Sequence, residues 1–264
     1  MRQKVFKSEG RRQAARLALL SCSMVTLAFG SAAIDQQHSG LMKSGPDDPI
    51  LVKALGKLTM RNDDHYPFTV AISMQITTGP AKTACNARVS FNPYLDPGSQ
   101  WSLAGDTTGA CANVFSDLLK TWTSLPKGEY AVTGIDPNAS IYDCEKRASD
   151  PGRSRFNCAI RLPSSYPDNA AWPSGHSTHT IIIDNGSGEM RTIISRLDQA
   201  ANRGNGHRLE ALTDTIDLAH FSDGAVRVVK SQGVQSGTQS GVAYKIETTT
   251  AYAYPTMSLD DGGR

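Results

Sequence analysis

The 264-residue chain lacks the sequence signatures that would identify a common catalytic chemistry. It contains no Gly-x-Ser-x-Gly nucleophile elbow, no His-Glu-x-x-His zinc helix and no close Cys-x-x-Cys pair. After the first 33 residues, no apolar run approaches 18 residues and no block is rich in Lys or Arg. We therefore predict no metal site, no cofactor, no nucleic-acid partner and no membrane span in the mature chain.

The first 33 residues have the order of a secretory signal peptide. Basic residues dominate positions 1–16, an uncharged apolar stretch runs from Leu17 to Phe29, and small residues lead to Ala33. This apolar stretch is shorter than the roughly 20 residues that span a bilayer, although an N-terminal anchor or a buried helix remains the alternative. We expect cleavage and a periplasmic or extracellular protein. Without this segment, acidic residues slightly outnumber basic ones.

Four cysteines remain after the signal peptide, and an even number in an exported chain predicts disulfides. Their order along the chain favours Cys85 with Cys111 and Cys144 with Cys158, because each pair closes a modest loop. A loop of this size stabilises the fold by roughly 3 kcal/mol in the chain-entropy model.

Several runs alternate between apolar and polar residues, which predicts strands with one buried face. The runs 68–77 and 87–91 lie on either side of the turn at Gly79-Pro80, so we expect them to pair as a hairpin. We expect further strands at 130–135, 141–144, 156–162, 180–183, 225–229, 242–246 and 252–254. The Gly-, Ser- and Gln-rich segment 231–241 is expected to be a linker.

Apolar residues at helical spacing occur in two segments, 111–122 and 190–201, the second with Ser187 as N-cap and Gly204 as its stop. The expected fold class is therefore α+β: a largely antiparallel sheet with two amphipathic helices packed on it, braced by two disulfides. The expected organisation is a signal peptide (1–33), a flexible leader (34–50), one domain (51–257) and a disordered tail (258–264).

The residues most suggestive of chemistry lie between Trp172 and His179. The core Pro173-Ser174-Gly175-His176 resembles one motif of the type 2 phosphatidic acid phosphatase and vanadium haloperoxidase superfamily. This resemblance implies that Ser174 holds a phosphate and that His176 is a general acid. Ser195-Arg196 resembles the opening of that superfamily's last motif, but the next histidine, His207, follows Arg196 at a longer interval, and the Lys-x6-Arg-Pro motif is absent.

Two functional hypotheses follow. The favoured one is a binding or interaction module of an exported protein, which contacts its partner through the Tyr-bearing C-terminal strand or the basic 145–155 hairpin, the latter suited to an anionic ligand. The alternative is a secreted hydrolase of phosphoesters or similar anionic esters. In that hydrolase, His176 or His179 is the general base, His207 the general acid, and Arg196 holds an anionic oxygen. Convergence of the three histidines in one cleft would favour the enzyme.

Overall fold

A computed structural model describes residues 48–59, 67–96, 99–104, 111–112, 115, 142–147, 150–160, 177–204, 206–222 and 224–254. Within these ranges the chain forms one antiparallel sheet of 11 strands in the order β3-β2-β1-β11-β10-β9-β7-β6-β5-β4, with β8 paired to β9. The strands are β1 (Phe68–Thr78), β2 (Ala81–Phe91), β3 (Trp101–Ala104), β4 (Tyr142–Arg147), β5 (Arg153–Ile160), β6 (Ser177–Asp184), β7 (Glu189–Leu197), β8 (Ala201–Gly204), β9 (His207–His220), β10 (Val226–Gln239) and β11 (Val242–Ala253).

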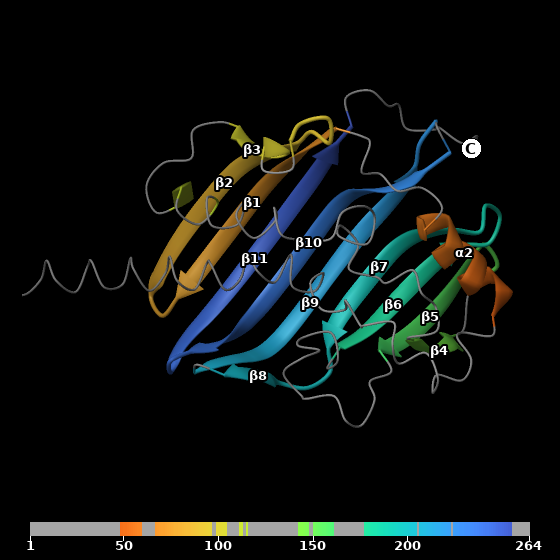
Figure 1. Ribbon diagram of the computed structural model, residues 1–264. Helices are drawn as coiled ribbons and strands as arrows, with labels where there is room; N and C mark the ends of the chain where they lie inside the picture. Colours follow the sequence, from red (N-terminus) through yellow and green to blue (C-terminus); the bar gives the residue numbers. More distant parts are fainter. Residues whose placement is uncertain are drawn as a thin grey trace, which may run out of the picture.

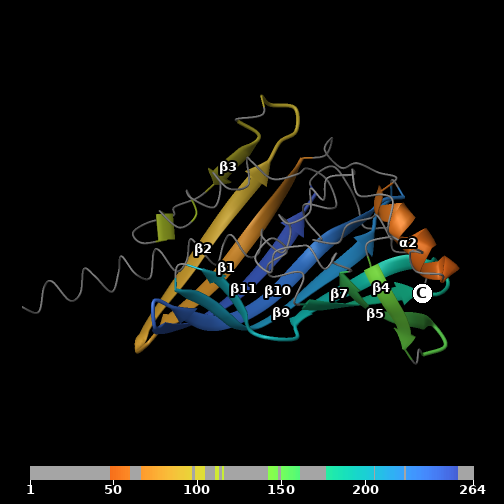
Figure 2. The ribbon, with the colours of Figure 1, turned by 60° about the horizontal axis from the view of Figure 1, so that its bottom comes forward.

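The sheet is twisted and curved (Figures 1 and 2). One of its faces carries most of the buried side chains. In β1, for example, Val70, Ile72 and Met74 are buried, whereas the intervening Ala71 and Ser73 are exposed. This alternation follows from the pleat, which points successive side chains to opposite faces. We call the face with the buried side chains the inner face and the other the outer face.

The helix α2 (Pro49–Thr59) packs against β6 and β7 (Figure 1). Asp48 caps it, because its carboxylate accepts a hydrogen bond from the Ile50 amide at 2.9 Å. The buried Leu51 and Leu55 lie one turn apart and face the sheet. The helix thus begins just inside the segment expected to be a flexible leader. No helix in the described ranges is long and apolar enough to cross a membrane.

The prediction of an α+β fold with two amphipathic helices packed on the sheet is wrong. The segment expected to form the second helix is β7 followed by β8. A β-bulge in the pairing of β6 with β7 causes this error, because it places Met190 and Ile193 on the same face although they are three residues apart. A spacing of three residues in a bulged strand is thus indistinguishable from a helical period.

The predicted 111–122 helix is described at only three positions. Cys111, Ala112 and Phe115 are helical, and Phe115 is fully buried in the core against β1 and β2. The rest of that segment, and the strand predicted at 130–135, lie outside the described residues.

Most strands begin or end near their predicted positions, and the hairpin about Gly79 is confirmed as β1 and β2. Gly79 has a φ of +53°, in the left-handed region that glycine adopts at little cost.

The predicted linker 231–241 is wrong, because residues up to Gln239 belong to β10. Its Gly, Ser and Gln residues resemble linker composition, although ladder pairing with β9 and β11 holds them in a strand.

Two large apolar clusters lie toward opposite ends of the inner face, and a smaller third one joins β7, β8 and β9 through Leu197, Ala201, Leu209 and Leu212. The first large cluster is built by α2 and strands β4 to β7 with parts of β9 and β10, and the second by β1, β2 and β11. Disulfides join Cys144 to Cys158 in the first and Cys85 to Cys111 in the second, the two pairs favoured by the sequence. The middle of the sheet lies between the two large clusters, and its inner face differs in chemistry.

Candidate functional site

The strand registers align one inner-face residue from each central strand into a single row across the sheet, which we call the central row. From β5 to β1 its members are Cys158, His179, Ser195, Asp214, Gly233, Thr248 and Met74. Neighbours in such a row have Cβ atoms roughly 5 Å apart. The row is apolar at its ends and polar in between, so polar groups occupy the inner face where the two apolar clusters separate.

His179 and Ser195 form a buried pair in the central row. The Nδ1 atom of His179 lies 2.8 Å from Ser195 Oγ, a hydrogen-bonding distance, while its Nε2 atom has no hydrogen-bond partner. Burial lowers the pKa of His179 to about 4, although the Asp198 carboxylate acts in the opposite direction. The imidazole is therefore neutral at pH 7, and one of its nitrogens is available to a bound molecule.

Asp214 is the acidic member of the central row. Its exposure is intermediate, and it forms no ion pair with any residue that the structure describes. Burial raises its pKa to about 7, against a smaller lowering by the Thr215 backbone amide. A Cβ atom added at Gly233 would lie 3.3 Å from Asp214 Oδ1, so the absence of a side chain at Gly233 lets the carboxyl group lie close to the backbone of β10.

The inner face of β10 adds small and polar residues next to Asp214. Ser231 Oγ lies 2.7 Å from Thr250 Oγ1, so these two hydroxyls satisfy each other. Gln235 is only 6% exposed, and its Oε1 atom has no hydrogen-bond partner. We call the residues of this region the polar strip: His179, Ser195, Asp214, Ser231, Gly233, Gln235, Thr248 and Thr250.

His207 lies away from the polar strip. It begins β9, where its Nε2 atom is 2.8 Å from the Tyr244 hydroxyl, and burial raises the pKa of Tyr244 above its usual value. His207 precedes Asp214 by seven residues along the same strand, which corresponds to roughly 20 Å. The structure therefore does not bring His179 and His207 together.

The other predicted catalytic residues are not part of the polar strip. Arg196 is exposed and follows the inward-facing Ser195, so it projects from the outer face. Ser174 and His176 lie outside the described residues. The predicted catalytic residues that the structure describes therefore lie on both faces of the sheet: His179 and His207 on the inner face and Arg196 on the outer face. Their catalytic role stays a hypothesis.

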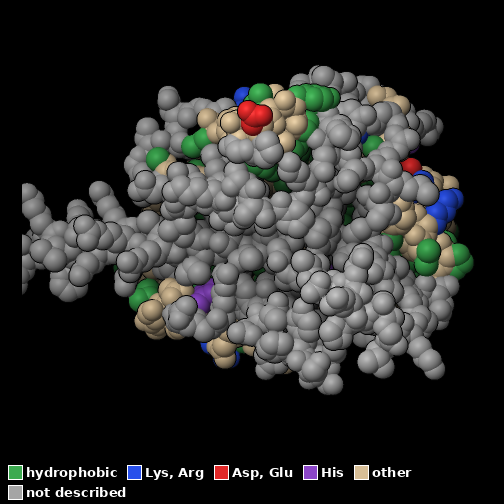
Figure 3. Space-filling view, viewed as in Figure 1, with side chains coloured by type: hydrophobic (Ala, Val, Ile, Leu, Met, Phe, Trp, Pro, Cys, Tyr) green, Lys and Arg blue, Asp and Glu red, His purple; other side chains and the backbone are tan. Residues whose placement is uncertain are grey.

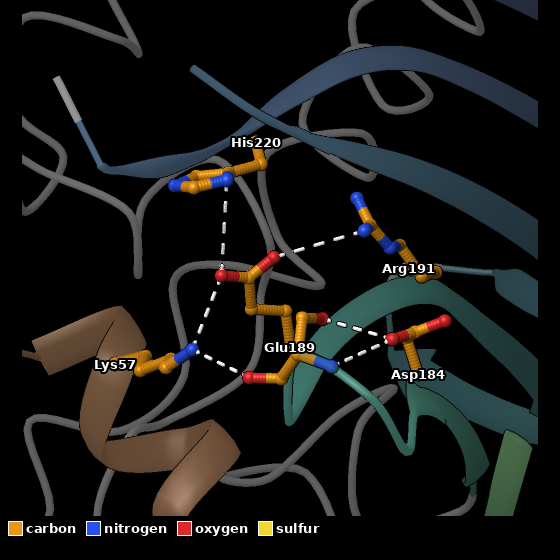
Figure 4. A network of polar contacts seen from close by, with 6 residues as sticks. Lys57, Asp184, Glu189, Arg191 and His220 are labelled. Atoms are coloured by element: carbon orange, nitrogen blue, oxygen red, sulfur yellow. Dashed lines mark hydrogen bonds and ion pairs between the residues drawn. The ribbon is translucent and has the colours of Figure 1, made fainter. Parts of the chain in front are cut away.

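A second polar cluster surrounds Glu189, whose side chain is 6% exposed (Figure 4). Lys57 of α2 approaches its carboxylate at 3.1 Å and donates a further hydrogen bond to the Ser187 carbonyl at 2.9 Å. The Arg191 guanidinium and His220 Nδ1 lie 3.7 and 3.9 Å from the same carboxylate. These contacts join α2, β7 and β9, so we assign the cluster a structural role.

Basic side chains of the 145–155 hairpin are partly engaged. Lys146 pairs with Asp48 at 2.8 Å and holds the pKa of that carboxyl below its usual value, and Arg147 pairs with Glu145 at 2.9 Å. Lys and Arg side chains also gather on the surface over α2 (Figure 3). Half of the basic residues expected to bind an anion therefore already have acidic partners. An anionic ligand at this hairpin stays a prediction.

No group of three metal-ligating side chains comes together within the described ranges. The polar strip offers hydrogen-bonding groups of a different kind: hydroxyls, a neutral imidazole, an amide oxygen and a carboxyl group. This set suits recognition of a polar group on an organic molecule.

The sequence analysis did not identify Gln235 or Gly233 as site residues. Their neighbours Gln232 and Ser236 are polar as well, so the segment shows no apolar–polar alternation that would mark Gly233 and Gln235 as residues of a buried face.

The fold and the polar strip together define a disulfide-braced protein built on one curved antiparallel sheet. No family model matches the sequence, and no curated protein is significantly similar to it.

Three solved structures align with most of the chain. A LolA superfamily protein from Nitrosomonas europaea is 12% identical, over 80% of this chain and 94% of that one, with a TM-score of 0.30. A putative outer membrane lipoprotein-sorting protein domain from Vibrio parahaemolyticus is 8% identical, over 81% and 93%, with a TM-score of 0.32. A DUF1329 family protein from Desulfovibrio piger is 8% identical, over 82% and 95%, with a TM-score of 0.33. The function of this chain is therefore argued from its own residues.

Proposed function

We propose that this protein is an exported binding protein that holds a small organic ligand against the polar strip of its inner face. The two disulfides support the exported part of the proposal, because disulfides persist in oxidising compartments and are rare in the cytosol. The signal peptide predicted at residues 1–33 provides the route, and a periplasmic or extracellular location follows from it.

The observation that carries the binding proposal is the pair of unpartnered polar atoms in the polar strip. His179 is 4% exposed and Gln235 is 6% exposed, yet His179 Nε2 and Gln235 Oε1 have no hydrogen-bond partner. Leaving such an atom unsatisfied costs about 1–3 kcal/mol. A ligand that supplies hydrogen bonds to these atoms recovers this free energy.

The ligand is expected to be amphipathic. The polar strip lies between two apolar clusters, and its residues Ser231 and Gly233 place no bulky side chain next to Asp214. A molecule placed there meets apolar side chains at both ends of the sheet and hydrogen-bonding groups in the middle. Sites for small molecules have this composition: mostly apolar, with a few convergent polar groups.

Fluorescence titration of the oxidised protein with N-phenyl-1-naphthylamine, a neutral apolar probe, tests the proposal. Gly233→Val fills the space beside Asp214 and is expected to weaken binding at least tenfold. Gln232→Val introduces the same side chain at the next residue of β10, which is exposed, and is expected to leave binding unchanged. Absence of binding, or equal binding by the wild type and Gly233→Val, would contradict the proposal.

A further inference from the structure

The unpartnered groups of the polar strip near Asp214 are predominantly hydrogen-bond acceptors. Gln235 Oε1 has no donor, and the Asp214 carboxyl group has only a backbone amide of its own strand. Gln235 pairs in register with Leu212, two residues before Asp214, so the two acceptors lie diagonally across β9 and β10. A ligand that complements them must bring donors.

Among the described residues, none around Asp214 on the inner face carries a positive charge. On the inner face, β7 contributes Ser195 and β10 contributes Ser231, Gly233 and Gln235, while Leu212 and Ile216 flank the carboxyl group on β9. The nearest titratable group in the central row is His179, one strand beyond Ser195, and it is neutral at pH 7. The carboxyl group therefore has no cation in the described part of the chain, although its intermediate exposure leaves it reachable.

We propose that the polar strip binds the ammonium group of an organic amine at Asp214. This inference rests on the proposed binding function and names the chemical class of its ligand. An ammonium group has three donors and no acceptor, which matches a carboxylate that has a single backbone amide as donor and an amide oxygen that has none. Gly233, the register partner of Asp214, places no side chain against the carboxylate that would compete with the ammonium group. The apolar clusters on either side take the carbon skeleton of the amine.

The charge of the site favours an amine over an anion. An anionic ligand would meet the Asp214 carboxylate without any Lys or Arg in the central row to compensate it. A bound ammonium group keeps Asp214 ionised, because an opposite charge at close range favours the charged form of a carboxyl group. Binding of the amine is therefore expected to weaken as acid protonates Asp214.

Two dansyl probes that differ only in charge test this inference. Dansylcadaverine carries a primary ammonium group, and its N-acetyl derivative is neutral. A charge-assisted hydrogen bond corresponds to roughly ten- to a hundredfold in affinity. We expect the wild-type protein at pH 8 to bind dansylcadaverine at least tenfold more tightly than the N-acetyl derivative, and this preference to shrink at pH 5.5.

Asp214→Asn is expected to abolish the preference while the neutral probe still binds. Asp217→Asn is the matched control, because Asp217 lies on the outer face of the same strand, where its Oδ1 accepts a hydrogen bond from Thr192. Equal binding of the two dansyl probes by the wild type, or a preference that persists in Asp214→Asn, overturns the inference and leaves the proposed function standing.

Failure of both dansyl probes and of N-phenyl-1-naphthylamine to bind would instead overturn the proposed function, and the inference with it. The pH comparison uses the wild-type protein alone, so it tests amine binding at Asp214 even if Asp214→Asn does not fold. A preference for the amine that is the same at pH 5.5 and pH 8 would also overturn the inference.

Discussion

Replacing Asp214 by Asn is expected to stabilise the unliganded protein above pH 7. Burial favours the protonated form of this carboxyl group and raises its pKa from the usual 3.8 to about 7 in the folded state. Well below pH 3.8, Asp214 is protonated in both the folded and the unfolded chain, so it contributes no pH dependence. As the pH rises, the unfolded chain releases the proton first, and the free energy of unfolding falls.

The size of the effect follows from the difference between the two pKa values. About three pH units at 1.36 kcal/mol each set an upper limit of about 4 kcal/mol, reached at pH 7 and constant above it. Because Asp214 keeps some exposure, solvent screening reduces this figure, and we expect about 2–3 kcal/mol. Asparagine keeps the shape of the side chain and does not ionise, so the variant avoids this loss.

Urea unfolding of the two proteins at pH 4, 5, 6, 7 and 8, with disulfides intact, measures the effect. The stability advantage of Asp214→Asn should grow from pH 4 to pH 7 and then level off, while Asp217→Asn on the outer face shows no such trend. An advantage independent of pH, or a variant less stable than the wild type at pH 8, would refute the description of Asp214 as a half-buried acid without a cation among the described residues.

Two further predictions concern stability. Lys57→Met should lower the free energy of unfolding by about 1–2 kcal/mol, because the buried Glu189 loses its shortest ion pair. Thermal or urea unfolding measures this loss. Lys53→Met, at an exposed position of the same helix, should have little effect. An equal loss in both variants would refute the role of the ion pair. Gly237→Ala should cost about 1–3 kcal/mol, because its Cβ would overlap a backbone carbonyl of β9. Gly152→Ala, whose Cβ meets open space, should stay within about 0.5 kcal/mol, and similar values for both glycines would contradict the packing described here.

Local patterning predicted those strands in which neighbouring residues alternate without interruption. The hairpin of β1 and β2 is the clearest case, because both runs alternate and Gly79-Pro80 forces a turn between them. In β7 the bulge moved Met190 and Ile193 to one face, so a strand had the apolar spacing of a helix. A bulge of this kind depends on how the segment pairs with its partner strand, and the sequence of the segment alone does not predict that pairing.

The polar strip could be predicted only in part. His179 was singled out because it lies close to His176 in the sequence, but its partner Ser195 lies on β7, which local patterning predicted as a helix. Gln235 lies in a segment whose composition predicted a linker. Asp214 carries no local signal, since its burial comes from strands that are distant in sequence. The site depends on the register of several strands, and the register was not accessible from single segments.

The side chains of His179 and Gln235 provide the most direct test of ligand binding at the polar strip. NMR signals of the His179 imidazole and the Gln235 side-chain amide would be followed while N-phenyl-1-naphthylamine is added to the isotope-labelled, oxidised protein. Ligand binding at the polar strip is expected to shift both signals with the same saturation curve and to leave the ring of His220 beside Glu189 unchanged. Shifts confined to His220 or to the 145–155 hairpin, with His179 and Gln235 unaffected, would contradict ligand binding there.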